Sequence, residues 1–243
     1  MSTLWNTIFY EPIYNALIFI INTVTFGDVG FAIIVLTILI KIFLAPLTRK
    51  SIRSQVLMKR LEGELKQIKK DYPSKEQQAQ KTLELYKKNN VNPFSGCLIV
   101  LLQLPVIFAL YYVFYRGLSF DTTPLYSFIH APEVLSTQFL GLVDLHGKSI
   151  VLALLAGISQ FIQGYLSHPT KKKIEVVAVV DEPKTFQEQL ADSMQLNIRY
   201  VLPVFVAFIA YQISAAVALY WVVSNVFTIV QEWYVRKSLV SNN

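Results

Sequence analysis

Apolar residues along this chain are gathered into long segments that polar, charged connections separate. Five of these segments are long enough to cross about 30 Å of hydrocarbon as a helix that rises 1.5 Å per residue. The predicted spans cover residues 29–49, 93–116, 149–167, 198–214 and 215–235. The pattern therefore predicts an all-α membrane protein with five transmembrane helices in one membrane domain.

The first 28 residues are apolar but differ from a span. They are interrupted by Asn6, Glu11, Pro12, Asn15 and Asn22. They also contain no Lys or Arg, so they lack the basic region of a removable signal. We expect residues 1–28 to form an external amphipathic helix that lies at the membrane interface, in preference to a helix that crosses it.

The segment from residue 50 to 92 has the pattern of a helical hairpin. Its first arm carries Leu57, Leu61, Leu65 and Ile68 on one helical face. The first span should end near Pro46. Residues 71–73 should end the first arm of the hairpin. Ser74 and Gln77 have the spacing of a capping box for the second arm, which Asn89 and Asn90 should end.

Loop charge gives the orientation. Residues 49–92 hold more than half of the chain's 22 Lys and Arg residues. The 168–197 loop and the 236–243 tail also carry Lys and Arg residues, which are Lys171, Lys172, Lys173, Lys184, Arg236 and Lys237. Residues 1–28 and the 117–148 loop are poor in lysine. Because basic loops stay in the cytosol, the N-terminus should lie outside and the hairpin, the 168–197 loop and the C-terminal tail inside.

Composition agrees with a membrane protein and argues against other classes. Hydrophobic residues make up 53% of the chain and charged residues 16%, with a mean hydropathy of +0.44. The net charge of +6 lies in particular loops, so we interpret it as a topology signal and not as a nucleic-acid surface. Cys97 is the single cysteine, which excludes an internal disulfide and is most simply a buried thiol.

Polar side chains within the predicted spans are the candidates for function, because an ionisable residue in lipid costs several kcal/mol unless water or a partner accepts it. Alone, Lys41 could extend its stem to the headgroups, and a single polar residue usually bonds another helix. Several such residues around one lysine favour a water-filled cavity. The candidate groove residues are Lys41, Thr37, Gln103, Gln160, Gln163, Tyr220, Trp221, Ser224 and Thr228.

Enzyme motifs are missing from the sequence. It contains no phosphate-binding P-loop, no dinucleotide fingerprint, no HExxH and no GxSxG. His130, His146 and His168 lie in or beside loops, so they suggest no intramembrane metal or acid-base site. We expect no enzymatic activity, no cofactor and no metal. The alternative from another class is a small transporter or channel with a polar cavity.

Three blocks of sequence resemble the YidC-type membrane protein insertases, a bacterial family with relatives in mitochondria and chloroplasts. They are TILIKIFLAPLT at residues 37–48, the stretch from Leu85 to Pro105 with VNPFSGC and LIVLLQLP, and ALYWVVSNVFTIV at residues 218–230. The resemblance covers nearly the whole chain. It implies five spans, an external amphipathic helix and a cytosolic helical hairpin, as the patterns above also predict.

The resemblance further implies a hydrophilic groove with one positive residue in the first span. That position is Lys41 here, where the family most often has arginine; lysine keeps the charge without the planar fork that binds carboxylates bidentately. The implied activity is insertion of client membrane proteins with short polar or acidic external tails, without nucleotide hydrolysis. Membrane lipids are implied partners, and a Sec-type translocon, the signal recognition particle receptor and the ribosome are candidates. The implied location is the bacterial inner membrane.

Overall fold

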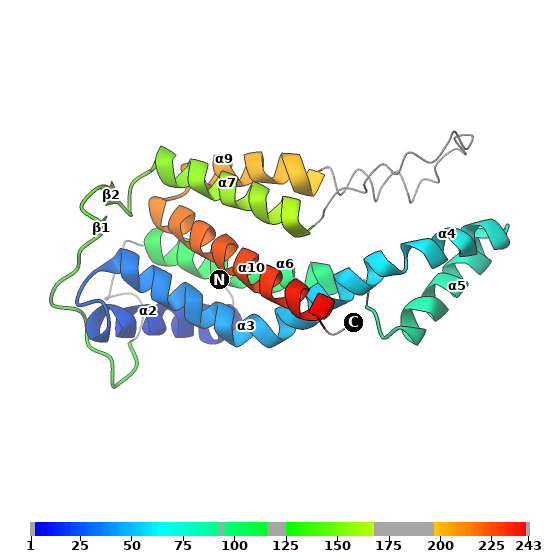
Figure 1. The fold of residues 1–243 in the computed structure, drawn as a ribbon. Coiled ribbons are helices and arrows are strands. Elements are labelled where there is room, and N and C mark those ends of the chain that lie inside the picture. Colours follow the sequence, from blue (N-terminus) through cyan, green and yellow to red (C-terminus); the bar gives the residue numbers. More distant parts are fainter. Residues whose placement is uncertain (1–2, 93–94, 116–124, 168–196, 242–243) are drawn as a thin grey trace. The chain divides into compact units, whose positions relative to one another are not determined.

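The computed structural model describes all residues except 1–2, 93–94, 116–124, 168–196 and 242–243. The described chain is mostly helical (Figure 1). Its elements are α1 (Thr3–Trp5), the π-helical turn η1 (Asn6–Tyr10), α2 (Glu11–Thr23), α3 (Val29–Arg60), α4 (Glu62–Asp71), α5 (Lys75–Lys88), α6 (Ser95–Tyr115), β1 (Gln138–Phe139), β2 (Val143–Asp144), α7 (Ile150–Ser167), the π-helical turn η2 (Asn197–Val201), α9 (Leu202–Gln212) and α10 (Ala215–Ser241). The predicted 168–197 loop lies outside the described residues except for Asn197, and nothing is described of the Cys97 side chain.

Among the described residues, three helices are long and apolar enough to cross a membrane. They lie at Val29–Arg60, Ile150–Ser167 and Ala215–Leu239. Two shorter apolar helices, Gln103–Tyr115 and Arg199–Gln212, correspond to the second and fourth predicted spans. Each of the five predicted spans thus coincides with an apolar helix among the described residues.

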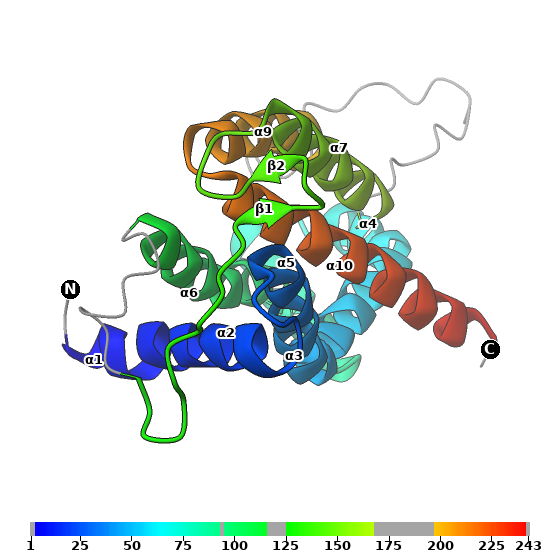
Figure 2. The same ribbon diagram turned by 90° about the vertical axis from the view of Figure 1, so that its left-hand side faces the viewer.

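The chain forms two compact units, and α3, α6 and α10 contribute residues to both. Unit 1 comprises Met1–Leu39 and Phe108–Ile229, and unit 2 comprises Ile40–Ile107 and Val230–Asn243. In unit 1, α2 runs across the first part of α3 (Figure 2). One face of α2 is buried, including Tyr14, Leu17, Ile18 and Ile21, because apolar residues recur there at helical spacing.

The segment after residue 124 is fastened to α2 and to the start of α3. Asn15 Oδ1 accepts a hydrogen bond from the Tyr126 backbone, and Asn22 Nδ2 donates to the His130 carbonyl. Gly27 has a positive φ of 96°, and a Cβ there would lie 2.7 Å from the Val134 carbonyl oxygen. Only glycine fits this turn without strain.

Strands β1 and β2 form a short antiparallel hairpin within unit 1, with Phe139 paired to Val143. The Phe139 ring lies directly over Gly30 of α3, where any side chain would collide with it. Beyond the hairpin, the carbonyls of Leu145 and Gly147 accept hydrogen bonds from the Ala216 and Ala215 amides. These carbonyls satisfy amides in the first turn of α10 that have no partner within the helix.

Helices α7 and α9 lie side by side in unit 1 (Figures 1 and 2). Gly157 allows this close approach, because a Cβ there would lie 2.8 Å from Ala207 Cβ and 3.2 Å from the Pro203 carbonyl oxygen. Small residues at helix contacts are a common device where lipid offers no hydrophobic driving force.

In unit 2, α4 and α5 pack against each other through a small apolar cluster. Leu61, Leu85 and Val91 are its buried members, with Leu57, Met58, Leu65, Ile68 and Tyr86 packed against them. The face predicted from helical spacing is therefore the packed one. Asn89 ends α5, and Asn90 follows it with a positive φ of 52°, as expected of an asparagine after a helix.

One local prediction in this region was wrong. The Ser74 hydroxyl does not cap α5; it donates a hydrogen bond to the Glu76 carboxylate, which is a stronger acceptor because it is charged. The predicted capping box with Gln77 is therefore not formed. Helix α3 continues through Pro46, where the first span was predicted to end, as far as Arg60.

In unit 2, the C-terminal part of α10 is hydrogen-bonded to α3. Gln231 Nε2 donates to the Ala45 carbonyl oxygen at 2.9 Å, and Arg60 Nη2 donates to the Leu239 carbonyl oxygen at 3.4 Å. Residues 236–241, predicted as a tail, continue the helix. Side-chain donors on one helix thus bind backbone carbonyls of the other.

Candidate functional site

The structure pairs two of the predicted site residues within unit 2. Lys41 Nζ donates a hydrogen bond to Gln103 Oε1 at 3.2 Å, which joins α3 to α6. Both side chains are half-buried. Lys41 follows Val29 by twelve residues, so it lies about 18 Å along α3 from its first residue. A cation and an amide thus meet in the interior of two apolar helices.

The Gln103 side chain has an unused donor. Its Nε2 atom is buried and has no hydrogen-bond partner among the described residues. An unsatisfied buried donor costs roughly 1–3 kcal/mol. A water molecule or an incoming carbonyl or carboxylate oxygen would remove that cost. The pair can therefore offer a positive charge and an N–H group to the same acceptor.

The hydroxyl groups of the predicted polar stripes are mostly used within their own helices. Thr37 Oγ1 donates to the Ile33 carbonyl at 2.6 Å, and Thr228 Oγ1 donates to the Ser224 carbonyl at 2.8 Å. Thr48, which shares a face with Lys41, bonds the Leu44 carbonyl in the same way. Such bonds are common for threonine in apolar helices. Helical spacing alone could not show whether these hydroxyl groups bond their own helix or are available to bind a client protein.

The remaining predicted site residues lie in unit 1. Gln160 and Gln163 on α7 and Trp221 on α10 are half-buried. Tyr220 and Ser224 are hydrogen-bonded to each other and buried, at 1% and 3% exposure. Tyr220 therefore lies in the core, with its hydroxyl bonded one helical turn away.

A buried polar contact in unit 1 was missed by the sequence analysis. Asn225 Nδ2 on α10 donates to Ser159 Oγ on α7 at 3.1 Å, and Ser159 in turn donates to the Ala156 carbonyl. Neither Asn225 nor Ser159 was among the predicted groove residues, although Ser159 directly precedes Gln160. A small polar residue next to a larger one gives little signal until the packing is known.

Unit 2 contains a buried carboxylate near the end of α10. Glu232 is 3% exposed and accepts two hydrogen bonds from Arg236, at 2.9 Å from Nε and 2.6 Å from Nη2. The sequence analysis counted Arg236 only as a cytosolic charge. Both donors bind the same carboxylate oxygen, which makes Arg236 the counter-ion of a buried acid one turn earlier.

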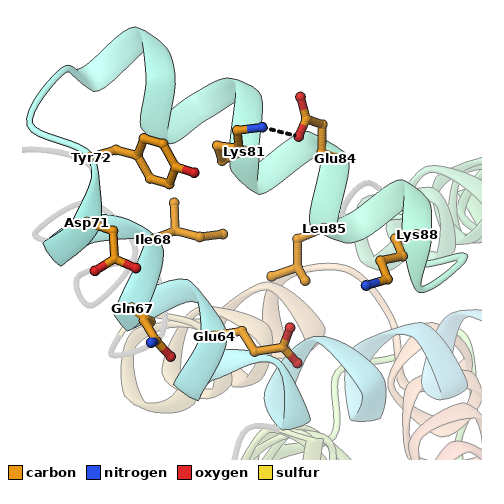
Figure 3. A pocket seen from close by; sticks show the side chains of 9 residues that line it. All are labelled: Glu64, Gln67, Ile68, Asp71, Tyr72, Lys81, Glu84, Leu85 and Lys88. Carbon is orange, nitrogen blue, oxygen red and sulfur yellow. Dashed lines mark hydrogen bonds and ion pairs between the residues drawn. The ribbon is translucent and has the colours of Figure 1, made fainter.

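The α4–α5 hairpin contains a pocket of about 350 Å³ with mixed chemistry (Figure 3). Ile68 and Leu85 lie between the two helices, and charged side chains surround them (Figure 3). The lining residues are Glu64, Gln67, Ile68, Asp71, Tyr72, Lys81, Glu84, Leu85 and Lys88. Such a surface can accept an apolar side chain flanked by charges of either sign.

Ionisable groups of the hairpin are mainly solvated. The hydrogen bond from Ser74 holds the pKa of the Glu76 carboxyl below its ordinary value, and the hydrogen bond to Glu84 raises the pKa of Lys81. Burial raises the pKa of Tyr86. Among the described residues, no three His, Cys, Asp or Glu side chains are grouped so that they could hold a metal ion.

Comparisons with known proteins find one family and several relatives that share one name. The sequence profile of a family described as "60Kd inner membrane protein" matches residues 20–242. A protein named membrane protein insertase YidC from Oceanobacillus iheyensis is 31% identical over 98% of this chain and 86% of its own length. Proteins of the same name are 32% identical in Fusobacterium nucleatum, over 94% of this chain and 97% of theirs, and in Campylobacter jejuni, over 96% and 38%.

A solved structure shares the fold. It is described as an active YidC insertase crystal structure with the first transmembrane domain resolved. The match has a TM-score of 0.57 at 20% identity and covers 96% of this chain. This chain spans 46% of that protein, so the likeness concerns one part of the larger molecule.

Proposed function

This chain belongs to the 60Kd inner membrane protein family, and we propose that it is a membrane protein insertase. In this proposal it moves transmembrane segments and short polar tails of client proteins into the bilayer without hydrolysing nucleotide. The observation that carries the proposal is the contact between Lys41 and Gln103, a cation and an unsatisfied amide donor within apolar helices. The names of the relatives suggest the class of activity. The contact between Lys41 and Gln103 suggests how the chain could attract a polar client tail.

Lys41 and Gln103 together suit an acidic or polar tail. The ammonium group attracts a carboxylate, and the free Gln103 N–H can bond one of its oxygens or a backbone carbonyl. Of the other candidates, Gln160, Gln163 and Trp221 are only half-buried and would offer further polar contacts to a client. Water in the proposed hydrophilic groove around Lys41 would keep its ammonium group charged.

The energetics favour a device that lowers a barrier. A client helix of about 20 residues gains roughly 0.3–0.6 kcal/mol for each Leu, Ile, Phe or Val near the membrane centre, whereas one Asp there costs roughly 2.5–3.5 kcal/mol. The inserted state is therefore stable for a tail with one or two acids. What slows insertion is the passage of those acids through hydrocarbon, and a wet, cationic groove shortens that passage.

We also propose a membrane arrangement. The five apolar helices cross the inner membrane with the N-terminus outside and the C-terminus in the cytosol, and residues 1–28 lie at the outer interface. The positive-inside rule supports this orientation, because residues 49–92 hold more than half of the basic residues. Clients, lipids and, as further candidates, a Sec-type translocon, the signal recognition particle receptor and the ribosome would then meet the cytosolic hairpin.

The proposal is tested by inserting a single-span client with an acidic tail into proteoliposomes. Lys41→Ala should reduce the insertion rate about tenfold, since a charge contact of about 1.4 kcal/mol is lost, and Lys41→Glu should reduce it further through repulsion. Lys41→Arg should retain activity. Lys50→Ala removes the same charge from an exposed position on α3 and serves as the matched control.

Normal insertion by both Lys41→Ala and Lys41→Glu would exclude the charged groove. Solute flux through the same vesicles, without client insertion, would favour a transporter or channel instead. Replacing residues 62–90 with a Gly-Ser linker separates two roles for the hairpin. If it receives clients or targeting factors, insertion should fall severalfold, whereas a purely lipid-facing hairpin leaves the rate nearly unchanged.

A further inference from the structure

Arg199 is a buried arginine for which the proposed function has no use. It lies in η2, immediately before α9, and is only 4% exposed. Its Nε atom is buried and has no hydrogen-bond partner among the described residues. Arginine cannot lose its proton in a protein, so the charge remains. A buried, charged donor without a partner is costly and calls for a ligand.

Aromatic rings fix the position of the guanidinium group. Its central carbon lies 4.0 Å from the centre of the Tyr165 ring and 5.8 Å from that of Tyr200. Phe161 connects the two tyrosines, with ring centres 6.3 Å from Tyr165 and 6.0 Å from Tyr200. Stacking on a ring face occupies the flat side of a guanidinium and leaves its edge donors free. The arrangement therefore presents hydrogen-bond donors for which no described residue supplies an acceptor to Nε.

The opposite end of the same helix pair shows how a cation is normally satisfied. Lys148 lies 5.5 Å from the centre of the Tyr211 ring, and its Nζ donates to Gln212 Oε1 at 2.9 Å. Both ends thus place a cation over a tyrosine. Only Lys148 has a side-chain acceptor among the described residues, so the shared geometry does not explain Arg199.

The surroundings of Arg199 identify the kind of acceptor. Phe161, Tyr165 and Tyr200 are each 40–52% exposed, so the guanidinium lies one layer below the apolar surface of the α7–α9 pair. Tyrosines of this kind gather at headgroup level in membrane proteins, where their hydroxyls meet polar groups. Basic residues predict that this end of the pair is cytosolic, the leaflet side rich in anionic lipid.

We infer that Arg199, Tyr165 and Tyr200 form a binding site for the phosphate of an anionic phospholipid headgroup. The Arg199 edge donates to phosphate oxygens, and the acyl chains lie along the exposed apolar side chains of α7 and α9. A shift of the Tyr200 ring, the more distant of the two, admits the phosphate. This site is independent of the proposed insertase activity, since it includes neither Lys41 nor Gln103.

Native mass spectrometry of the full chain in neutral detergent tests the site. We expect phosphatidylglycerol to bind more tightly than phosphatidylcholine. Arg199→Gln should weaken the first phosphatidylglycerol binding event about tenfold, because a charged hydrogen bond is lost. Arg199→Lys should weaken it less, since the charge remains without the fork. Lys237→Gln is the matched control: it removes a cation that lies 5.1 Å over the Trp233 ring in unit 2.

Equal phosphatidylglycerol binding by the wild-type chain and Arg199→Gln would overturn the inference. An equal loss in Lys237→Gln would do the same, because binding would then follow total charge. Displacement of the lipid by millimolar inorganic phosphate would assign the site to a free anion instead. If Arg199→Gln does not fold, Arg199→Lys decides, and wild-type affinity in that variant would exclude the guanidinium fork.

Discussion

Two lysines of unit 2 make similar contacts in different surroundings. Lys41 donates to Gln103 at 3.2 Å within apolar helices, and Lys81 contacts Glu84 at 2.7 Å on the surface of the α4–α5 hairpin. The second contact is shorter and has a full countercharge. Its side chains are nevertheless 41% and 54% exposed, so water competes with it. Exposed ion pairs of this type contribute roughly 0.2–1 kcal/mol.

The difference teaches that distance alone does not rank polar contacts. If the Lys41 ammonium group leaves Gln103, it can contact water or hydrocarbon, and placing a charge in hydrocarbon costs far more free energy. Around Lys81, water is always available. The same type of donor can therefore be essential within the helices and dispensable in the hairpin. Each prediction below changes one region and uses the other as its reference.

The largest expected effect comes from Gln103→Glu. A carboxylate beside Lys41 would form a buried ion pair, which raises resistance to unfolding in detergent but leaves no charge for a client tail. Insertion of an acidic-tailed client should fall about tenfold, the equivalent of 1.4 kcal/mol. Glu84→Gln in the hairpin should leave both properties within twofold. An active Gln103→Glu variant would show that insertion does not require the positive charge of Lys41.

Two glycines sharpen the comparison through packing. Gly157→Ala places a methyl group 2.8 Å from Ala207 Cβ and should destabilise the α7–α9 contact by about 1–3 kcal/mol. Around Gly63 in α4 nothing lies within 4 Å, so Gly63→Ala should stabilise the helix by about 0.5–1 kcal/mol. Detergent unfolding curves measure both changes. Effects of the same sign would contradict the close helix contact.

The smallest effects concern neutral and charged polar pairs. A double-mutant cycle with Asn225→Leu and Ser159→Ala should give a coupling of about 0.6 kcal/mol, the average for hydrogen bonds between membrane helices. The cycle for Lys81→Gln and Glu84→Gln should give a smaller coupling, which high salt abolishes. A salt-dependent Asn225 coupling would indicate that this pair is reached by solvent.

Local patterns predicted much of the secondary structure. Apolar length located every long helix, and the spacing of Leu61, Leu65 and Ile68 identified the packed face of the hairpin. Asn89 ended α5 as expected. These features depend on residues a few positions apart, so they can be found without knowing the fold. The family resemblance, drawn from three blocks, agrees with the relatives found over most of the chain.

Local patterns failed where a residue had several available partners. Ser74 has the residue type of a helix cap, yet its hydroxyl bonds the Glu76 carboxylate. Pro46 was predicted to mark the end of the first span, and the structure adds that the helix itself continues past it to Arg60. Thr37 shares a face with Lys41, and its hydroxyl donates to the Ile33 carbonyl of the same helix.

By itself the sequence determined the membrane class, the positions of the apolar helices, the family and the presence of one lysine deep in the first of them. Only the tertiary structure decided that Gln103 accepts a hydrogen bond from Lys41, that Ser159 accepts one from Asn225, and that Arg199 lies buried against Tyr165. The reason is physical: helical spacing is fixed by neighbours along the chain, whereas a contact between helices depends on how each is rotated and how closely small residues let them approach.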